Sequence, residues 1–262
     1  MIRFLLICCI ALFTISFISP EKKIDFSDNV VIAHRGAWKK DNLPENSIAS
    51  LKRAIELKCT GSEFDVRITA DDSLIVNHDA HFEKLPIEET SYADLEIHKL
   101  SNGEKLPTLR EYLLAGLENN TTTRLICEIK PSETSQERGQ EIAEKVYRLV
   151  EKVGAGKMVV YISFDYEMLK KLISLDPSVR TQYLRGDVAP DQLKADGMTG
   201  LDYHYSVFKK QPEWIDEAKR NHLVLNAWTV DKEDDMKWLL DKGFDQITTN
   251  EPELLLKITK KP

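Results

Sequence analysis

Three acidic side chains and a lysine occur at a spacing that could support chemistry. Glu63 and Asp65 are two residues apart in the segment GSEFDVRI, which has the composition of a β-strand. Alternate residues of a strand face the same side, so these two carboxylates are expected to lie side by side. Glu128 and Lys130 repeat this spacing in LICEIK. Carboxylates held together repel one another unless a cation or a proton compensates for their charge.

A hard divalent cation would satisfy this requirement. Glu63, Asp65 and Glu128 offer only oxygen ligands, which suit Mg²⁺ or Ca²⁺ with water or substrate in the remaining positions. The charges of the three carboxylates, one such cation, Arg35 and Lys130 would sum to a single positive charge. A phosphodiester carries one negative charge and is bound well by guanidinium and ammonium groups. We therefore predict three metal ligands, with Arg35 and Lys130 as phosphate ligands.

Two histidines could supply the proton transfers that cleavage of a phosphodiester needs. His34 follows the apolar run VVIA, and His78 ends a segment that returns from the turn Asp71-Asp72-Ser73. Near pH 7 a histidine can take up or give up a proton, so we predict this pair as general acid and base, in either order. We expect the other histidines to be superficial or structural, namely His81, His98, His204 and His222.

Several other polar or aromatic residues have two interpretations. Trp228 falls at the end of an apolar segment, where it could cover the carbon skeleton of a substrate or fill the core. Glu45 and Asn46 fit the start of a helix, and this is the role we predict for at least one of them. Ser163 and Asn250 could cap the ends of strands.

Eight short apolar segments alternate with segments of helical periodicity. This alternation predicts a parallel sheet, and eight repeats predict a (β/α)₈ TIM barrel, in which active-site residues lie where the strands end. An open doubly wound sheet is the alternative, but the sequence lacks the Gly-rich phosphate loop that it needs. The predicted strands are 30–34, 63–65, 125–130, 159–164, 180–184, 201–205, 224–228 and 246–250.

The second repeat carries a short insertion, at about residues 67–106. It begins with the hairpin that would bring His78 back to Glu63 and Asp65, and it continues as a charged segment with no clear period. The barrel itself is predicted to span residues 29–262. No G-x-S-x-G elbow and no H-E-x-x-H or C-x-x-C pair occurs, so a serine nucleophile and a zinc site are not expected.

Composition narrows the class of partner and the compartment. The net charge of the 262 residues is −7, and no large basic cluster occurs, so we expect a small-molecule substrate and no nucleic acid. Residues 1–19 hold one early arginine and a long apolar run, as in a signal peptide or an N-terminal anchor. We expect export to the periplasm or secretion, with membrane contact only through this leader if it is not cleaved. The sequence does not pair Cys59 and Cys127.

Taken in order, HRG, PENS, EFDVRITAD, VNHD, EIK, ISF, NAWTV and ITTNEP resemble the motifs of the glycerophosphodiester phosphodiesterase family. The resemblance implies a TIM barrel, one divalent cation, and hydrolysis of glycerophosphodiesters to sn-glycerol 3-phosphate and an alcohol. It implies the same roles for the metal ligands, the phosphate ligands and the two histidines predicted above, and it implies that Trp228 lies on the substrate side. Ser47 stands where this family usually has Thr, and Asn250 where it often has Asp.

Two alternatives share much of this pattern. A sphingomyelinase D or phospholipase D-like enzyme would act on lipid phosphodiesters with similar metal ligands and histidines. A non-catalytic barrel would bind a phosphodiester without turnover, but it would have no reason to keep every proposed group.

Overall fold

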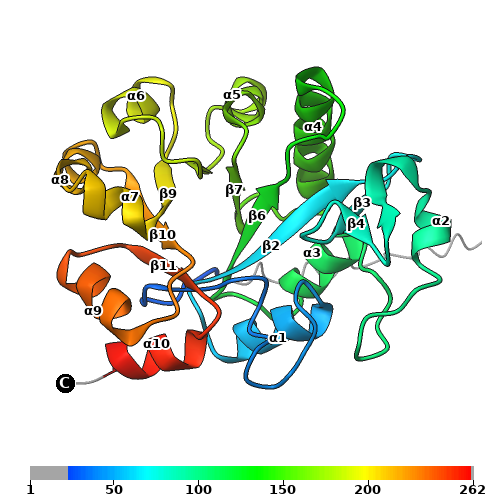
Figure 1. Cartoon of the computed structure of the whole chain (residues 1–262), viewed down its shortest axis with the longest axis horizontal. Helices are drawn as coiled ribbons and strands as arrows, with labels where there is room; N and C mark the ends of the chain where they lie inside the picture. Colours follow the sequence, from blue (N-terminus) through cyan, green and yellow to red (C-terminus); the bar gives the residue numbers. More distant parts are fainter. Residues whose placement is uncertain (1–22, 261–262) are drawn as a thin grey trace, which may run out of the picture.

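The computed structural model describes residues 23–260. Within them, eight parallel strands close into a barrel that is surrounded by helices (Figure 1). The ring closes because β1 pairs in parallel with both β2 and β11, which confirms the TIM barrel and excludes the open sheet. The barrel strands are β1 (Val31–Ala33), β2 (Gly61–Ile68), β6 (Arg124–Ile129), β7 (Val159–Ser163), β8 (Thr181–Tyr183), β9 (Gly200–His204), β10 (Val224–Trp228) and β11 (Gln246–Thr249).

Strand register explains why the acidic residues converge. Asp65 on β2 lies opposite Glu128 on β6. The alternating residues Phe64 and Val66 face outward into the main core, where Phe64 packs against Tyr112 with ring centroids 4.5 Å apart. The side chains of Glu63 and Asp65 therefore face the inside of the barrel, as the two-residue spacing predicts.

The helices pack around the barrel and bury their apolar sides against it. Local signals set where they begin: Ser47 accepts a hydrogen bond from the Ser50 amide at the start of α1, and Thr108 and Glu111 form a capping box on α3. The helices that follow the strands are α1 (Ile48–Glu56), α3 (Leu109–Leu117), α4 (Gln136–Lys152), α5 (Tyr166–Leu175), α6 (Pro190–Ala195), α8 (Glu213–Arg220), α9 (Glu233–Asp241) and α10 (Pro252–Thr259).

One further helix, α7 (Tyr205–Lys210), follows β9 without a break and is absent from the sequence prediction. Its N-cap is His204, whose ring nitrogen accepts from the Ser206 amide. The predicted strand extends through Tyr205, because the aromatic residues of this segment do not indicate that β9 ends at His204. As the N-cap of α7, His204 has the second of the two roles expected for it, superficial or structural.

The insertion is more ordered than the sequence predicts. After the antiparallel pairing of β2 with β3 (Leu74–Val76), it contains β4 (His81–Phe82), β5 (Leu85–Pro86), the 3₁₀ helix η1 (Ile87–Glu89) and α2 (Tyr92–Leu95). These elements are too short to show a sequence period. They bury a small core of their own, formed by Ile75, Phe82, Ile87, Leu95 and Leu106. In Figure 1 the insertion lies to one side of the barrel, beside β2 and β3.

The predicted leader, residues 1–19, lies outside the described residues. Among the helices of residues 23–260, none combines the length and apolar character needed to cross a membrane. Cys59 and Cys127 are buried free thiols. The polypeptide that positions the site is thus the barrel with its insertion.

Candidate active site

A cavity of about 130 Å³ opens at the ends of the barrel strands. Seven of the eight predicted site residues line it: His34, Arg35, Glu63, His78, Glu128, Lys130 and Trp228. The eighth, Asp65, is fully buried and pairs with two of them, Lys130 and Arg35. A larger cavity of about 410 Å³ lies near the starts of β7 and β8, away from these residues. The predicted group is therefore assembled in one place.

The three carboxylates form a compact, buried cluster. One oxygen from each of Glu63, Asp65 and Glu128 lies within 4.8 Å of the others. Oxygen ligands of one hard cation, at about 2.0 to 2.6 Å from it, have similar mutual separations. Glu63 Oε1 is buried and has no hydrogen-bond partner among the described residues. These donors therefore fit a single divalent cation, which would complete the coordination of an otherwise orphaned oxygen.

Electrostatics in the cluster point the same way. Burial, together with the charges of Asp65 and Glu128, raises the pKa of Glu63 well above its usual value. Burial and the charge of Asp65 raise the pKa of Glu128 to about 7. Although burial opposes ionisation of Asp65, the nearby Lys130 ammonium holds the pKa of Asp65 at about 2. When ionised, the three carboxylates thus carry more negative charge than Lys130 and Arg35 neutralise, and the two raised pKa values reflect this excess.

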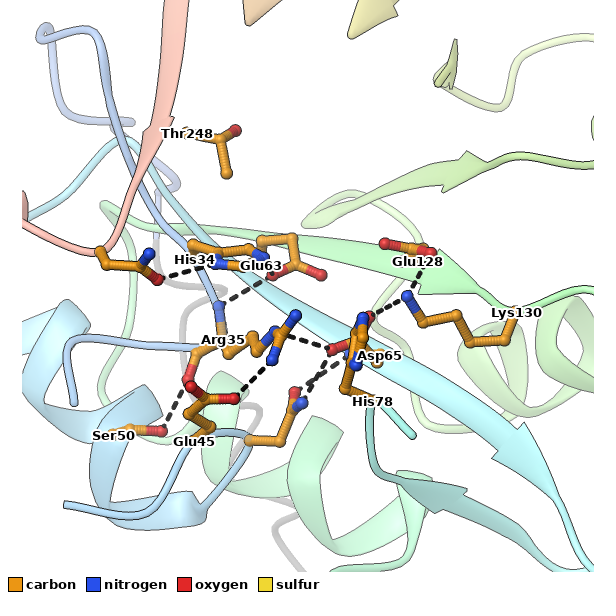
Figure 2. A network of polar contacts seen from close by, with 12 residues as sticks. His34, Arg35, Glu45, Ser50, Glu63, Asp65, His78, Glu128, Lys130 and Thr248 are labelled. Carbon is orange, nitrogen blue, oxygen red and sulfur yellow. Dashed lines mark hydrogen bonds and ion pairs between the residues drawn. The ribbon is translucent and has the colours of Figure 1, made fainter. Parts of the chain in front are cut away.

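Lys130 lies inside this cluster. Its Nζ is 2.5 Å from Glu128 Oε1 and 2.7 Å from Asp65 Oδ1, and the residue is almost completely buried (Figure 2). Burial lowers the pKa of Lys130, but the two carboxylates outweigh this effect and raise it overall. The ammonium therefore stays charged at the cavity wall, which is compatible with the predicted contact to a phosphate.

The backbone at Arg35 forms an unusual turn. Its φ is 56°, and Gly36 follows with φ of 82°, a position where an added Cβ would collide with Ser50. This turn directs the Arg35 amide to Glu63 Oε2, at 2.8 Å. The guanidinium lies 2.6 Å from Glu45 Oε2. The HRG motif thus orients one predicted metal ligand through its backbone while the Arg35 side chain lines the cavity.

The helix-start prediction for Glu45 and Asn46 is wrong. Ser47 caps α1, while Glu45 pairs with Arg35. The Asn46 amide clamps Asp65 twice: Nδ2 donates to Asp65 Oδ2 at 2.8 Å, and Oδ1 accepts from the Asp65 backbone amide at 3.1 Å. The sequence does carry a signal for the role of Asn46. Ser47 alone can cap the helix, so the second polar residue before it needs another partner.

His34 is held by a chain of hydrogen bonds. Its Nδ1 lies 2.8 Å from Asn250 Oδ1, and Asn250 Nδ2 donates to Asp231 Oδ2, also at 2.8 Å. Because the Asp231 carboxylate can only accept, the amide oxygen of Asn250 must face His34, and Nδ1 carries the proton. Nε2 then faces Glu63, 4.0 Å from Oε2. Asn250 is thus a partner of His34 rather than only a strand cap.

His78 approaches the cluster from the insertion. Its Nδ1 lies 2.7 Å from the carboxylate of Asp79, and its carbonyl accepts from Arg67 Nε at 2.9 Å. Figure 2 shows the His34 ring beside Glu63 and the His78 ring beside Asp65. The His78 side chain is 38% exposed and that of His34 18%. Each ring uses Nδ1 for support, so each has Nε2 available for a substrate.

The far wall of the cavity is largely apolar. Trp228 packs edge to face against Phe164, with centroids 5.5 Å apart, and Ile162 and Leu184 extend the wall. Trp228 is partly buried and lines the cavity, so this position is compatible with both interpretations that the sequence allows. By contrast, Ser163 is structural as expected, because its hydroxyl donates to the Ile129 carbonyl and accepts from the Asp165 amide.

Asp202, on β9, also lines this wall and was absent from the predicted site. Burial and the charge of Glu128 raise the pKa of Asp202 well above its usual value. No second acidic residue at a two-residue spacing draws attention to it. Within GLDYHYS, the sequence signal was only an acidic residue inside an apolar strand, where a charge needs a partner.

Residues 34–254 match the model of the glycerophosphoryl diester phosphodiesterase family. The chain belongs to this family. A glycerophosphodiester phosphodiesterase of Caldanaerobacter subterraneus subsp. tengcongensis is 32% identical over 246 residues, which cover 88% of this chain and 98% of that one.

Solved structures agree with this assignment. A glycerophosphodiester phosphodiesterase from Parabacteroides distasonis is 42% identical, with a TM-score of 0.85 over 89% of this chain and 98% of that one. An Oleispira antarctica phosphodiesterase in complex with the product sn-glycerol-3-phosphate is 23% identical, with a TM-score of 0.78 over 89% and 97%, and shows the shared fold. The predicted family, fold and enzyme class are confirmed.

Proposed function

We propose that the protein hydrolyses glycerophosphodiesters to sn-glycerol 3-phosphate and an alcohol, in a reaction that depends on one divalent cation, Mg²⁺ or Ca²⁺. The observation that carries this proposal is the convergence of two histidines, two cationic side chains and three carboxylates on one cavity. Family membership and the 32% identical relative named for this activity support the same substrate class.

Each group has a distinct task in this proposal. Glu63, Asp65 and Glu128 hold the cation, which when bound supplies a Lewis acid for a phosphoryl oxygen. Arg35 and Lys130 bind the phosphate oxygens and favour the charge that develops during cleavage.

The histidines move the protons. One imidazole Nε2 takes a proton from the attacking water molecule, and the other gives a proton to the leaving alcohol oxygen. The support of both rings at Nδ1 by hydrogen bonds fixes their orientation. Their order in the reaction is open, because both rings face the same cavity.

The test is a substrate panel with and without chelator. We expect release of sn-glycerol 3-phosphate from glycerophosphocholine, loss of that activity in EDTA, and recovery with Mg²⁺ or Ca²⁺. Turnover only of lysophosphatidylcholine or sphingomyelin would indicate a phospholipase D-like enzyme. Saturable binding without turnover would indicate a non-catalytic barrel, and activity indifferent to chelation would remove the cation from the mechanism.

We further propose that the protein is exported, to the periplasm or the medium. The support is the apolar leader at residues 1–19. Cell fractionation, with sequencing of the mature N-terminus, tests this. Recovery of the protein with an intact N-terminus in the cytosolic fraction would contradict it, whereas an intact N-terminus in the membrane fraction would indicate an anchor.

A further inference from the structure

Asp202 is a buried carboxyl group that the reaction scheme above does not use. Its chain neighbours Leu201 and Tyr203 face the main core, where Tyr203 packs against Phe208 and Trp214. Alternation along β9 therefore directs the Asp202 side chain to the inside of the barrel. The residue is 1% exposed, and its Oδ1 has no hydrogen-bond partner among residues 23–260. A buried polar atom of this kind is unfavourable unless something pairs with it.

The position of Asp202 separates it from the metal-ligand cluster. In the closed ring, β9 lies four strands from β2 in either direction, so Asp202 faces Glu63 and Asp65 across the barrel. It is not among the three carboxylates that lie within ligand distance of one another. It does line the same cavity. A phosphoryl group bound at the cluster would have Asp202 on its far side.

The surroundings of Asp202 combine one polar group with an apolar wall. Trp228 Nε1 donates to the Asp202 backbone carbonyl at 2.8 Å, which fixes the indole against the backbone of Asp202, and both residues line the cavity. Phe164, Ile162 and Leu184 line the cavity with them. This pairing suits a small group that has both hydroxyls and a carbon skeleton. A polyol such as glycerol has this chemistry.

Size and exposure indicate which end of the substrate would lie there. The cavity of about 130 Å³ is small beside ligand pockets of roughly 300 to 1,000 Å³. That is enough for a group of a few heavy atoms but not for a long head group or an acyl chain. The His78 side chain is 38% exposed, so a head group on that side can lie in solvent.

We propose that Asp202 determines specificity for the glycerol end of the substrate. Its carboxyl group hydrogen-bonds a glycerol hydroxyl, and Trp228 covers the adjacent carbon atoms. A hydroxyl can donate to a carboxylate or accept from a carboxylic acid, so either protonation state serves. This inference rests on the proposed function, because it supposes a glycerophosphodiester at the cluster.

The experiment compares two substrates that share a head group. Glycerophosphocholine and methylphosphocholine differ only in glycerol against methyl. We expect Asp202→Leu to lower kcat/KM for glycerophosphocholine by about 10- to 100-fold and to leave that for methylphosphocholine within about 3-fold. Asp202→Asn keeps a hydrogen-bonding group and should fall between. Gln182→Leu removes a buried polar group from the neighbouring strand, away from this cavity, and should affect both substrates alike.

An equal loss of kcat/KM for both substrates with Asp202→Leu would overturn the proposal and indicate a general structural role. An unchanged kcat/KM for both substrates would also overturn the proposal. If Asp202→Leu does not fold, the ratio measured with Asp202→Asn decides. If the wild type turns over neither substrate, the proposed function fails, and calorimetry still tests Asp202. The wild type should then bind sn-glycerol 3-phosphate more tightly than methyl phosphate. The Asp202→Leu variant should bind these two ligands with equal affinity.

Discussion

Replacing Asn46 with alanine should destabilise the protein more than most single substitutions. The change removes both hydrogen bonds of the clamp on Asp65 and leaves the Asp65 amide and Oδ2 buried with one partner fewer. A hydrogen bond to a charged group contributes about 1.5 to 3 kcal/mol, and one to a neutral group about 1 kcal/mol. Alanine at the φ of 57° found here adds about 1 kcal/mol. The expected loss in the free energy of unfolding is about 3 to 5 kcal/mol.

Urea unfolding and thermal melting, both with the metal-free protein, measure this loss. For a chain of this size, 1 kcal/mol corresponds to roughly 2 to 4 °C, so Tm should fall by about 10 °C. Asn46→Gly is the matched control, because it removes the same side chain but tolerates the positive φ. It should be about 1 kcal/mol more stable than Asn46→Ala.

Metal affinity provides a second readout of the same clamp. Since Asn46 orients a predicted ligand, both variants should also bind the cation more weakly, by about 10-fold or more. A loss of stability under 1 kcal/mol for Asn46→Ala, with unchanged metal affinity, would refute the reasoning. It would mean that Lys130 and Arg35 suffice to position Asp65.

Three other predictions concern the reaction and its pH dependence. His34→Ala and His78→Ala should each lower kcat by about 100-fold or more, whereas the exposed His81→Ala should not; near-normal rates for both would show that the acid–base assignment is wrong. Asn250→Leu should lower kcat by about 10-fold with little change in KM, because the His34 ring loses its support, and Asn250→Asp, which keeps an acceptor, should recover most of the rate; a changed KM alone would point to substrate binding instead. The raised pKa of Glu128, about 7, means that protonation stabilises the fold, so the metal-free protein should lose stability as pH rises from about 4.5 through 7, and added cation should reverse the loss; melting curves across this range that stay level would contradict it.

The sequence predicts the barrel and the acidic cluster well because both depend on local repetition. Eight alternations of strand and helix specify the fold, and a two-residue spacing places Glu63 with Asp65 on one face. Parallel pairing then brings Glu128 beside them without further information. The position of His78 followed from the hairpin, whose two strands are joined by a short turn.

The supporting residues were harder to predict because their partners are distant in the chain. Asn46 meets Asp65 across 19 residues, and Asn250 meets His34 across 216. Their local sequence matches a helix start and a strand end, which are the commoner uses of asparagine. For Asp202 the only local signal is an acidic residue inside an apolar strand. Only the closed ring shows that it faces the cavity.

The insertion has a consequence for how activity could be lost. His78 is the single member of the predicted site that comes from outside the eight barrel repeats, and the insertion that carries it packs on a small core of its own. Regions with few buried contacts open more easily than the rest of a protein. A nick or a transient opening in residues 77–106 would therefore withdraw one of the two proposed proton-transfer groups while the acidic cluster kept its shape. Such a molecule would still capture its ligand but release it unchanged.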